Sequence, residues 1–117
     1  MRSKSAVPAL SDILHHIRLA QAFVAGLDYE AFRSDLRTVF AVIRCLEVIS
    51  EASRRLRPAL KDRHPSIAWK QIAGAGNVYR HDYEDVTAHI VWDTVARDFP
   101  ATLRAVIEME LANSPSF

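Results

Sequence analysis

An arginine, a histidine and a tyrosine lie within four positions of one another, at Arg80, His81 and Tyr83. The guanidinium of Arg is always charged, and its fork of N–H donors matches the oxygens of a phosphate. Histidine has an unperturbed pKa of about 6.5, so it can accept or donate a proton near neutral pH. The Tyr83 phenol adds a hydroxyl that can donate or accept a hydrogen bond. A phosphate-binding cation beside a proton-transfer group predicts a site that cuts or holds RNA.

Basic residues are concentrated in the segment that leads to this cluster. Residues 54–80 contain seven Lys or Arg and one Asp, a balance of 7 − 1 = +6, whereas residues 82–117 have a balance of 2 − 7 = −5. The net charge of +1 hides this asymmetry. Because an electropositive surface attracts polyanions, we expect Arg54, Arg55 and the amide of Asn77 to bind RNA phosphates. The alternative is that these charges cover two ordinary solvated faces.

The cluster must be positioned by helices, because apolar residues recur every three or four positions through almost the whole chain. The pattern predicts helices over residues 12–27, over 34–56, from 67 through the Arg80–Tyr83 cluster, over 87–99 and over 101–111. No strand-like alternation competes with this pattern. We therefore predict an all-α fold, a single up-down bundle of four to five helices, with residues 1–117 forming one domain.

Capping and breaking residues set the expected boundaries. Ser11 or Asp12 can cap the first helix, and Ser66 can cap the third. The expected breaks between helices lie at Gly26, Asp28, Pro58 and Pro65. Gly and Asp favour turns, and proline lacks the N–H that would continue a helix.

The predicted third helix brings the polar residues of the cluster onto one side. Two neighbouring stripes follow the spacing i, i+4, i+7: Gly76, Arg80 and Tyr83, and beside them Asn77, His81 and Glu84. Gly74 and Gly76 lie inside this helix, and each costs about 1 kcal/mol relative to Ala. We expect a bend or a close backbone approach at these glycines.

Cleavage of RNA by its own 2′-hydroxyl needs a base for that oxygen and an acid for the leaving oxygen. The cluster supplies one histidine, His81. A symmetric homodimer would bring two copies of His81 to one cleft, so we expect the chain to dimerise.

Two carboxylates on the second predicted helix, Glu47 and Glu51, are one turn apart. They could support the Arg-His face, or they could pair with neighbouring Arg residues and stabilise their own helix. Trp69 and Trp92 could stack on RNA bases, but their positions beside apolar stripes favour packing roles.

The sequence predicts no metal site and no cofactor. The other histidines are scattered without a metal-ligand spacing, and Gly74 and Gly76 lack the Lys and Ser/Thr of a phosphate-binding loop. The single cysteine, Cys45, lies in an apolar helical pattern, which favours a buried thiol and a reducing compartment. No apolar stretch approaches the roughly 20 residues that a bilayer requires, so we expect a cytoplasmic protein.

Four segments carry a resemblance to a known family: AVIRCLEVISEASRRL, PSIAWKQIAG, GNVYRHDYEDV and IVWDTVARDFPATLRAVIE. They resemble successive helices of HepT-like proteins, the toxins of the HEPN superfamily, and the similarity extends over about residues 9–112. The resemblance implies an all-α dimer, a metal-independent endoribonuclease toxin, and both active-site motifs in one cleft. It also implies a minimal nucleotidyltransferase antitoxin as partner, which in some systems attaches AMP to the motif Tyr.

In that family the motif is an Arg, four to six residues, His, one residue and Tyr. His81 and Tyr83 match the His and the Tyr, which makes Tyr83 the expected site of AMPylation. Gly76 stands where the family usually has Arg, five positions before the His. Arg80 lies one helical turn along the same stripe, roughly 6 Å away, so we expect Arg80 to substitute. The alternative function is a non-catalytic module that binds a nucleotide or the nucleotidyltransferase, or a bundle that only assembles partners.

Overall fold

The computed structural model describes the backbone of residues 5–78, 84–98 and 100–114, and the side chains of these residues except 75–78, 84–87, 98 and 100. The elements in these ranges are α1 (Val7–Val24), α2 (Tyr29–Ser34), α3 (Leu36–Arg54), α4 (Pro58–Asp62), α5 (Trp69–Val78), α6 (Glu84–Asp93), the π-helical segment η1 (Thr94–Asp98) and α7 (Pro100–Ala112). The all-α prediction is confirmed for these ranges.

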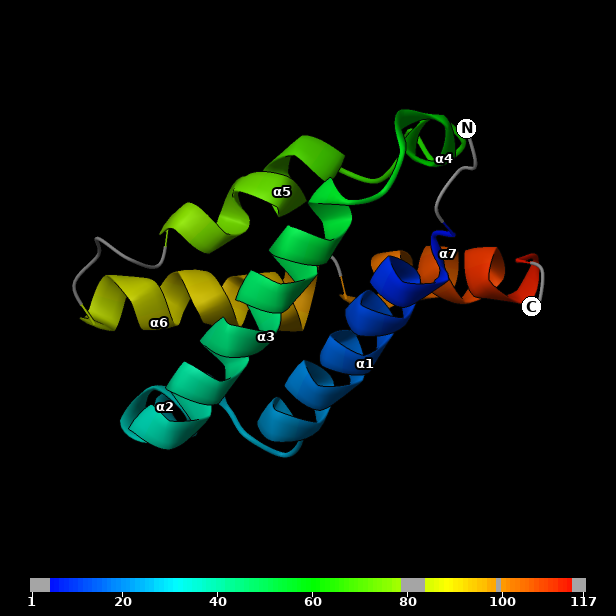
Figure 1. Ribbon diagram of the computed structural model, residues 1–117. Helices are drawn as coiled ribbons and strands as arrows, with labels where there is room; N and C mark the ends of the chain where they lie inside the picture. Colours follow the sequence, from blue (N-terminus) through cyan, green and yellow to red (C-terminus); the bar gives the residue numbers. More distant parts are fainter. Residues whose placement is uncertain (1–4, 79–83, 99, 115–117) are drawn as a thin grey trace.

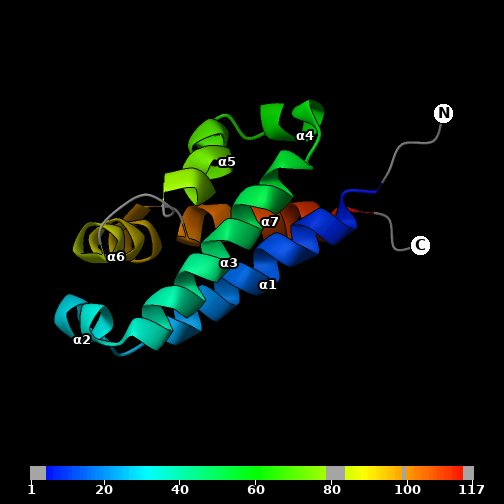
Figure 2. The same ribbon diagram turned by 60° about the vertical axis from the view of Figure 1, so that its left-hand side comes forward.

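Two long antiparallel helices, α1 and α3, form the centre of the molecule (Figures 1 and 2). On the other sides, α5 packs against α3 and α7 packs against α1, while α2 holds α6. The core lies where these helices meet. Its fully buried aliphatic side chains come from α1, α3, α6 and α7: Leu10, Ile13, Ile17, Val42, Ile49, Val91, Leu103 and Ile107.

The first helix begins four residues before the predicted cap. It starts at Val7 with Pro8 in its first turn, and the Leu10 N–H donates to the Ala6 carbonyl at 2.9 Å. Proline is favoured there because its missing N–H would have no helical partner. The prediction that Ser11 or Asp12 caps this helix is therefore wrong.

Two short helices are not predicted by the apolar pattern: α2, which precedes α3, and α4, which follows it. The Asp28 carboxylate accepts from the Ala31 N–H at 2.8 Å and starts α2, and the Asp35 carboxylate accepts from the Thr38 N–H and hydroxyl and starts α3. These hydrogen bonds hold the pKa of Asp35 below its ordinary value. Gly26, with φ of 78°, makes the predicted turn.

The second predicted helix stops before Pro58, as expected, but Pro58 then begins α4 as its first-turn residue. The described residues thus contain seven α-helices, and the predicted four or five correspond to α1, α3, α5, α6 and α7. Helices of five or six residues hold too few apolar positions to show a period.

The third predicted helix is shorter at its start than expected. The helix α5 begins at Trp69, and the Ile72 N–H donates to the Ala68 carbonyl at 3.0 Å, so Ser66 is not its cap. Glu84 belongs to the separate helix α6, which begins three residues before the predicted start at Thr87. The prediction that Glu84 continues the stripe of the third helix is therefore wrong.

The fourth predicted helix does not continue as one α-helix through residue 98. The α-helical geometry ends at Asp93, and η1 follows before α7 begins at Pro100. The Thr94 hydroxyl donates to the Ile90 carbonyl at 2.9 Å. Such back-bonding by Thr often bends a helix, and the Pro at 100 cannot donate a helical hydrogen bond. None of the helices in the described ranges is both long and apolar enough to cross a membrane.

Candidate functional site

The segment that carries the predicted chemistry joins α5 to α6. Arg80, His81 and Tyr83 lie outside the described residues. Asn77 lies in the last turn of α5, where only its backbone is described. The structure therefore shows how the two flanking helices are held in the fold.

A buried serine fixes the middle of α5 to α3. The Ser50 side chain is 1% exposed, and its hydroxyl donates to the backbone carbonyl of Ala73 at 2.7 Å. The hydroxyl of Ser53, also buried, donates to the Ser50 carbonyl at 2.7 Å. Ile72 anchors the same turn because its side chain lies in the core. The described part of α5 extends five residues beyond Ala73, to Val78. Ser50 could not be identified from the sequence, because a serine within an apolar pattern gives no sign of its partner.

Gly74 shows no close approach of the kind that the sequence led us to expect. A Cβ built on Gly74 would meet no atom within 4 Å. The residue faces open space beside the Ser50–Ala73 hydrogen bond. The prediction of a close backbone approach is wrong at Gly74.

The helix α6 is held by aromatic side chains from α2. Phe32 is fully buried, and its ring centroid lies 5.2 Å from that of Trp92. The Tyr29 ring meets the His89 ring edge-on, with centroids 5.5 Å apart. Trp92 is thus a packing residue, as its apolar stripe predicts. Because α6 begins one residue after Tyr83, this contact anchors the second end of the segment.

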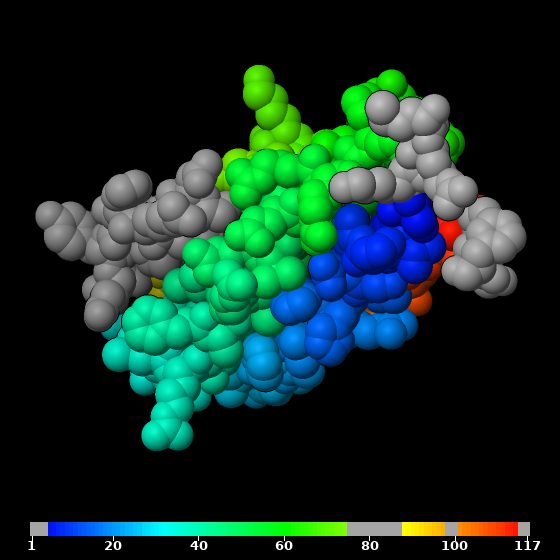
Figure 3. All heavy atoms as spheres, in the orientation of Figure 1, coloured from blue at the N-terminus to red at the C-terminus, as the bar shows by residue number. Residues whose placement is uncertain are grey.

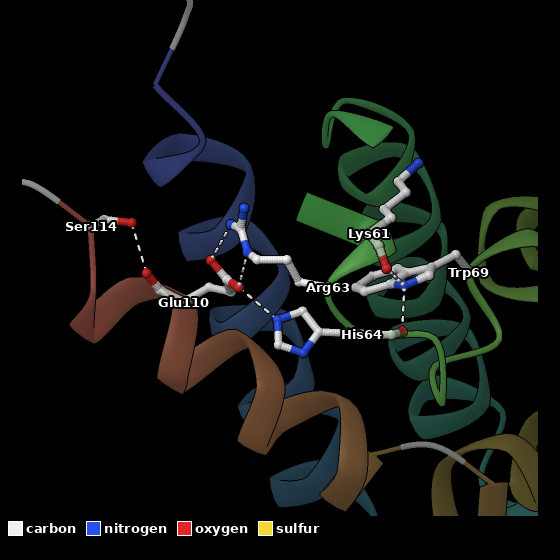
Figure 4. Close-up of polar contacts among 6 residues, drawn as sticks. All are labelled: Lys61, Arg63, His64, Trp69, Glu110 and Ser114. Carbon is white, nitrogen blue, oxygen red and sulfur yellow. Dashed lines mark hydrogen bonds and ion pairs between the residues drawn. The ribbon is translucent and has the colours of Figure 1, made fainter. Parts of the chain in front are cut away.

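A carboxylate on α7 fixes the connection that leads into α5 (Figure 4). Glu110 is 8% exposed and accepts from the Arg63 guanidinium at 2.9 and 3.2 Å, and it lies 2.6 Å from Nε2 of His64. The Trp69 indole N–H donates to the carbonyls of Lys61 and His64, both at 3.1 Å. This cluster ties α4 and the start of α5 to α7. The sequence gives no sign of this cluster, because Glu110 lies 47 positions from Arg63 and 46 positions from His64.

The hydrogen bonds from Arg63 hold the pKa of Glu110 below its ordinary value of 4.5, although burial acts in the opposite direction. A carboxyl with a lowered folded-state pKa stabilises the fold above its unfolded pKa, and this contribution is lost as the pH falls through the folded pKa. The stabilisation by Glu110 is thus complete at neutral pH and is lost below pH 4.5.

We expect Glu110→Gln to lower the free energy of unfolding at pH 7 by about 2 kcal/mol, because it removes charge-assisted hydrogen bonds. The difference from wild type should shrink as the pH falls below 4.5. Urea unfolding of both proteins between pH 7 and pH 3 measures this difference in the free energy of unfolding. Glu108→Gln is the control, since Glu108 lies on the same helix and makes exposed ion pairs; its effect should stay within about 0.5 kcal/mol. If both variants lose the same free energy of unfolding at every pH, Glu110 does not stabilise the fold as a charged hydrogen-bond acceptor.

The remaining candidate residues lie on α3 and its C-terminal end. Glu47 lies 3.7 Å from Arg44 on its own helix, which is the helix-stabilising pairing considered above, and Glu51 is exposed. Arg54 is exposed, and Arg55 lies 2.8 Å from the Asp12 carboxylate of α1. A role for these residues in the site stays a prediction.

Cys45 is 3% exposed in the core of α3. Burial raises the pKa of its thiol, which opposes formation of a nucleophilic thiolate. The prediction of a buried thiol is confirmed.

Comparison with known proteins gives a family for this arrangement of helices. The family model described as "Ribonuclease HepT-like" matches residues 13–109. The "Probable ribonuclease HepT" of Thermococcus cleftensis is 38% identical over 92 residues, which cover 79% of this chain and 84% of the relative. Two provisionally named RNases are also similar. One, from Caldanaerobacter subterraneus, is 31% identical over 106 residues, covering 91% of this chain and 95% of the relative. The other, from Methanocaldococcus jannaschii, is 33% identical over 97 residues, which cover 83% of this chain and 89% of the relative.

No solved structure gives a significant match. The family match spans the chain from the second turn of α1 to the last turn of α7, and therefore includes both helices that flank the Arg80–Tyr83 segment. The chain belongs to the HepT-like ribonuclease family.

Proposed function

We propose that this protein is a metal-independent endoribonuclease and the toxin of a toxin–antitoxin pair. The observation that carries the proposal is the family match over residues 13–109, together with Arg80, His81 and Tyr83 in the segment between α5 and α6. The fixed ends of that segment support it, because catalytic groups need a rigid frame. The Ser50–Ala73 hydrogen bond and the Phe32–Trp92 contact supply such a frame.

In the proposed reaction the 2′-oxygen of a ribose attacks the adjacent phosphorus. One His81 removes the proton from the 2′-hydroxyl, and a second His81, from the other copy in a homodimer, protonates the departing 5′-oxygen. The P–O bond to the 5′-oxygen breaks as the new bond forms, which leaves a 2′,3′-cyclic phosphate and a free 5′-hydroxyl. Arg80 would stabilise the negative charge that grows on the non-bridging oxygens.

The other proposed roles concern substrate binding. Asn77 and Arg54 would contact phosphates beside the one that is cleaved, and Arg55 would do so by exchanging its ion pair with Asp12 for a phosphate. Tyr83 would hydrogen-bond to the RNA, and Glu47 or Glu51 could support the Arg-His face from α3. These roles follow from residue type and position in the chain.

The proposed partner is a minimal nucleotidyltransferase antitoxin that attaches AMP to Tyr83. A phenol close to a guanidinium is suited to this modification, since Arg80 can hold the phosphate that is added. The AMP group would then block the site with bulk and negative charge. The mass of the chain after co-expression with such a partner tests this proposal, and an unchanged mass with toxicity still neutralised would show control by binding alone.

The alternative is a non-catalytic module that binds a nucleotide or the nucleotidyltransferase. Gly76 in place of the usual motif Arg is the feature that favours it. The two functions differ in one observable property, which is cleavage of RNA by the isolated chain.

We expect the purified chain to cleave single-stranded RNA in the presence of a chelating agent and to leave 2′,3′-cyclic phosphate ends. The reason is that the 2′-hydroxyl is the nucleophile and His81 transfers the proton, so that no metal-bound water is required. Gel analysis of end-labelled RNA, before and after acid opening of the cyclic phosphate, measures both properties. Loss of cleavage with the chelator and recovery on adding a divalent ion would refute the proposed mechanism.

A further inference from the structure

The basic side chains that the structure describes fall into two groups. Among the twelve Lys and Arg with described side chains, seven lie within 4.0 Å of a carboxylate: Arg18, Arg33, Arg44, Arg55, Arg63, Arg97 and Arg104. Within the described side chains, the other five have no such partner: Arg37, Arg54, Arg57, Lys61 and Lys70. Four of these five lie between residues 54 and 70.

These four residues come from three consecutive elements. Arg54 ends α3, Arg57 precedes α4, Lys61 lies in the last turn of α4, and Lys70 lies in the first turn of α5. We call them the 54–70 basic surface. The end of α3, α4 and the start of α5 lie together in both ribbon views and form a continuous green region in Figure 3.

The fold holds these elements against one another. The Trp69 indole donates to the backbone carbonyl of Lys61, which places the last turn of α4 beside the first turn of α5. Leu56, Leu60 and Ile67 are buried beneath the connection. The one acidic residue in the segment is Asp62, so the four cations keep a local charge of 4 − 1 = +3.

The ion pairs change the interpretation of the sequence. Arg55 and Arg63 belong to the same basic segment, but Asp12 and Glu110 neutralise them from distant parts of the chain. Elsewhere in the described chain almost every Arg has a carboxylate neighbour. A group of neighbouring cations that has no carboxylate neighbour among the described side chains is suited to phosphates, which would supply negative charge.

We propose that the 54–70 basic surface binds backbone phosphates of the RNA strand other than the phosphate at which cleavage occurs. The protein then acts on RNA chains rather than on short oligonucleotides. This inference rests on the proposed function. The helix α5 leads from Lys70 to Val78 at the edge of the motif segment, a rise of about 12 Å over eight residues. RNA held both at the 54–70 basic surface and at the motif segment would therefore extend beyond the scissile phosphate. Contacts of this kind read the backbone and not the bases.

The test is the triple variant Arg57→Gln, Lys61→Gln, Lys70→Gln, with binding measured by anisotropy of a fluorescent 30-nucleotide single-stranded RNA whose 2′-hydroxyls are methylated, so that it cannot be cut. Three lost phosphate contacts should reduce the slope of log affinity against log salt by about 2 and weaken binding roughly tenfold or more near 0.1 M salt. A labelled trinucleotide should lose much less affinity. The control is Arg18→Gln, Arg33→Gln, Arg97→Gln, which removes equal charge from paired residues; it should keep the wild-type salt slope.

If the triple variant and the control lose equal RNA affinity, the effect comes from net charge alone, and the inference is overturned. Unchanged RNA binding in the triple variant would also overturn it, including the case in which binding of a nucleotidyltransferase is lost instead. Circular dichroism and thermal unfolding establish that both variants are folded. The binding assay does not depend on cleavage, so RNA binding by a chain that cuts nothing would refute the proposed function and leave this inference intact.

Discussion

His81→Ala and Arg80→Ala are each expected to abolish the growth arrest caused by expressing the chain alone. His81 is the proposed proton-transfer group, and loss of such a group typically costs 10²- to 10⁴-fold in rate. Arg80 is the proposed stabiliser of the transition-state charge, and loss of one such donor costs about 10²- to 10³-fold. Colony counts after induction, with protein levels checked by immunoblot, measure the effect.

Tyr83→Phe is the matched control for these variants, because it alters the same segment and keeps the ring. It should leave much of the toxicity but remove control by a nucleotidyltransferase that acts through AMP transfer. If Arg80→Ala stays fully toxic, Arg80 does not replace the Arg that the family usually has at the position of Gly76. If His81→Ala stays fully toxic, the assignment of the proton-transfer group is wrong.

Phe32→Ala is expected to lower the free energy of unfolding by about 3–5 kcal/mol, the usual cost of removing a fully buried Phe. The Phe32 side chain has no exposed surface and lies against Trp92, so its loss leaves a cavity between α2 and α6. Chemical denaturation with urea, followed by tryptophan fluorescence and by circular dichroism, measures the change.

The matched control is Phe40→Ala on α3. Phe40 is 59% exposed, and surface substitutions usually change stability by no more than about 0.5 kcal/mol. Similar losses in the two variants would contradict the described packing of α2 against α6. The comparison also bears on the candidate site, because the Phe32–Trp92 contact anchors α6, the helix that begins directly after Tyr83.

The long helices could be predicted from the sequence because each carries an apolar stripe over many turns. The first helix shows this well, since Ile13 and Ile17 recur at helical spacing and are buried. The short helices α2 and α4 could not be predicted in this way, because their start signals, Asp28 and Pro58, are also typical of breaks between helices. A capping Asp and a Pro also begin helices, so the same residues were compatible with both outcomes.

The contacts that hold the site segment could not be predicted, because they join residues far apart in the chain. Nothing near Ser50 indicates that its hydroxyl meets the carbonyl of Ala73, 23 positions away. The charge count of the sequence was informative but incomplete for the same reason. It counted Arg55 and Arg63 with the other cations of residues 54–80, whereas the fold neutralises both with distant carboxylates.

Whether the Arg80–Tyr83 segment cuts RNA with His81 is tested by comparing single-turnover cleavage of one defined RNA by purified wild type and His81→Ala. We expect cleavage by the wild type and a rate at least about 100-fold lower in the variant, with unchanged unfolding by urea. Equal cleavage rates in the two proteins would contradict this expectation, as would a folded wild type that binds the RNA and leaves it intact.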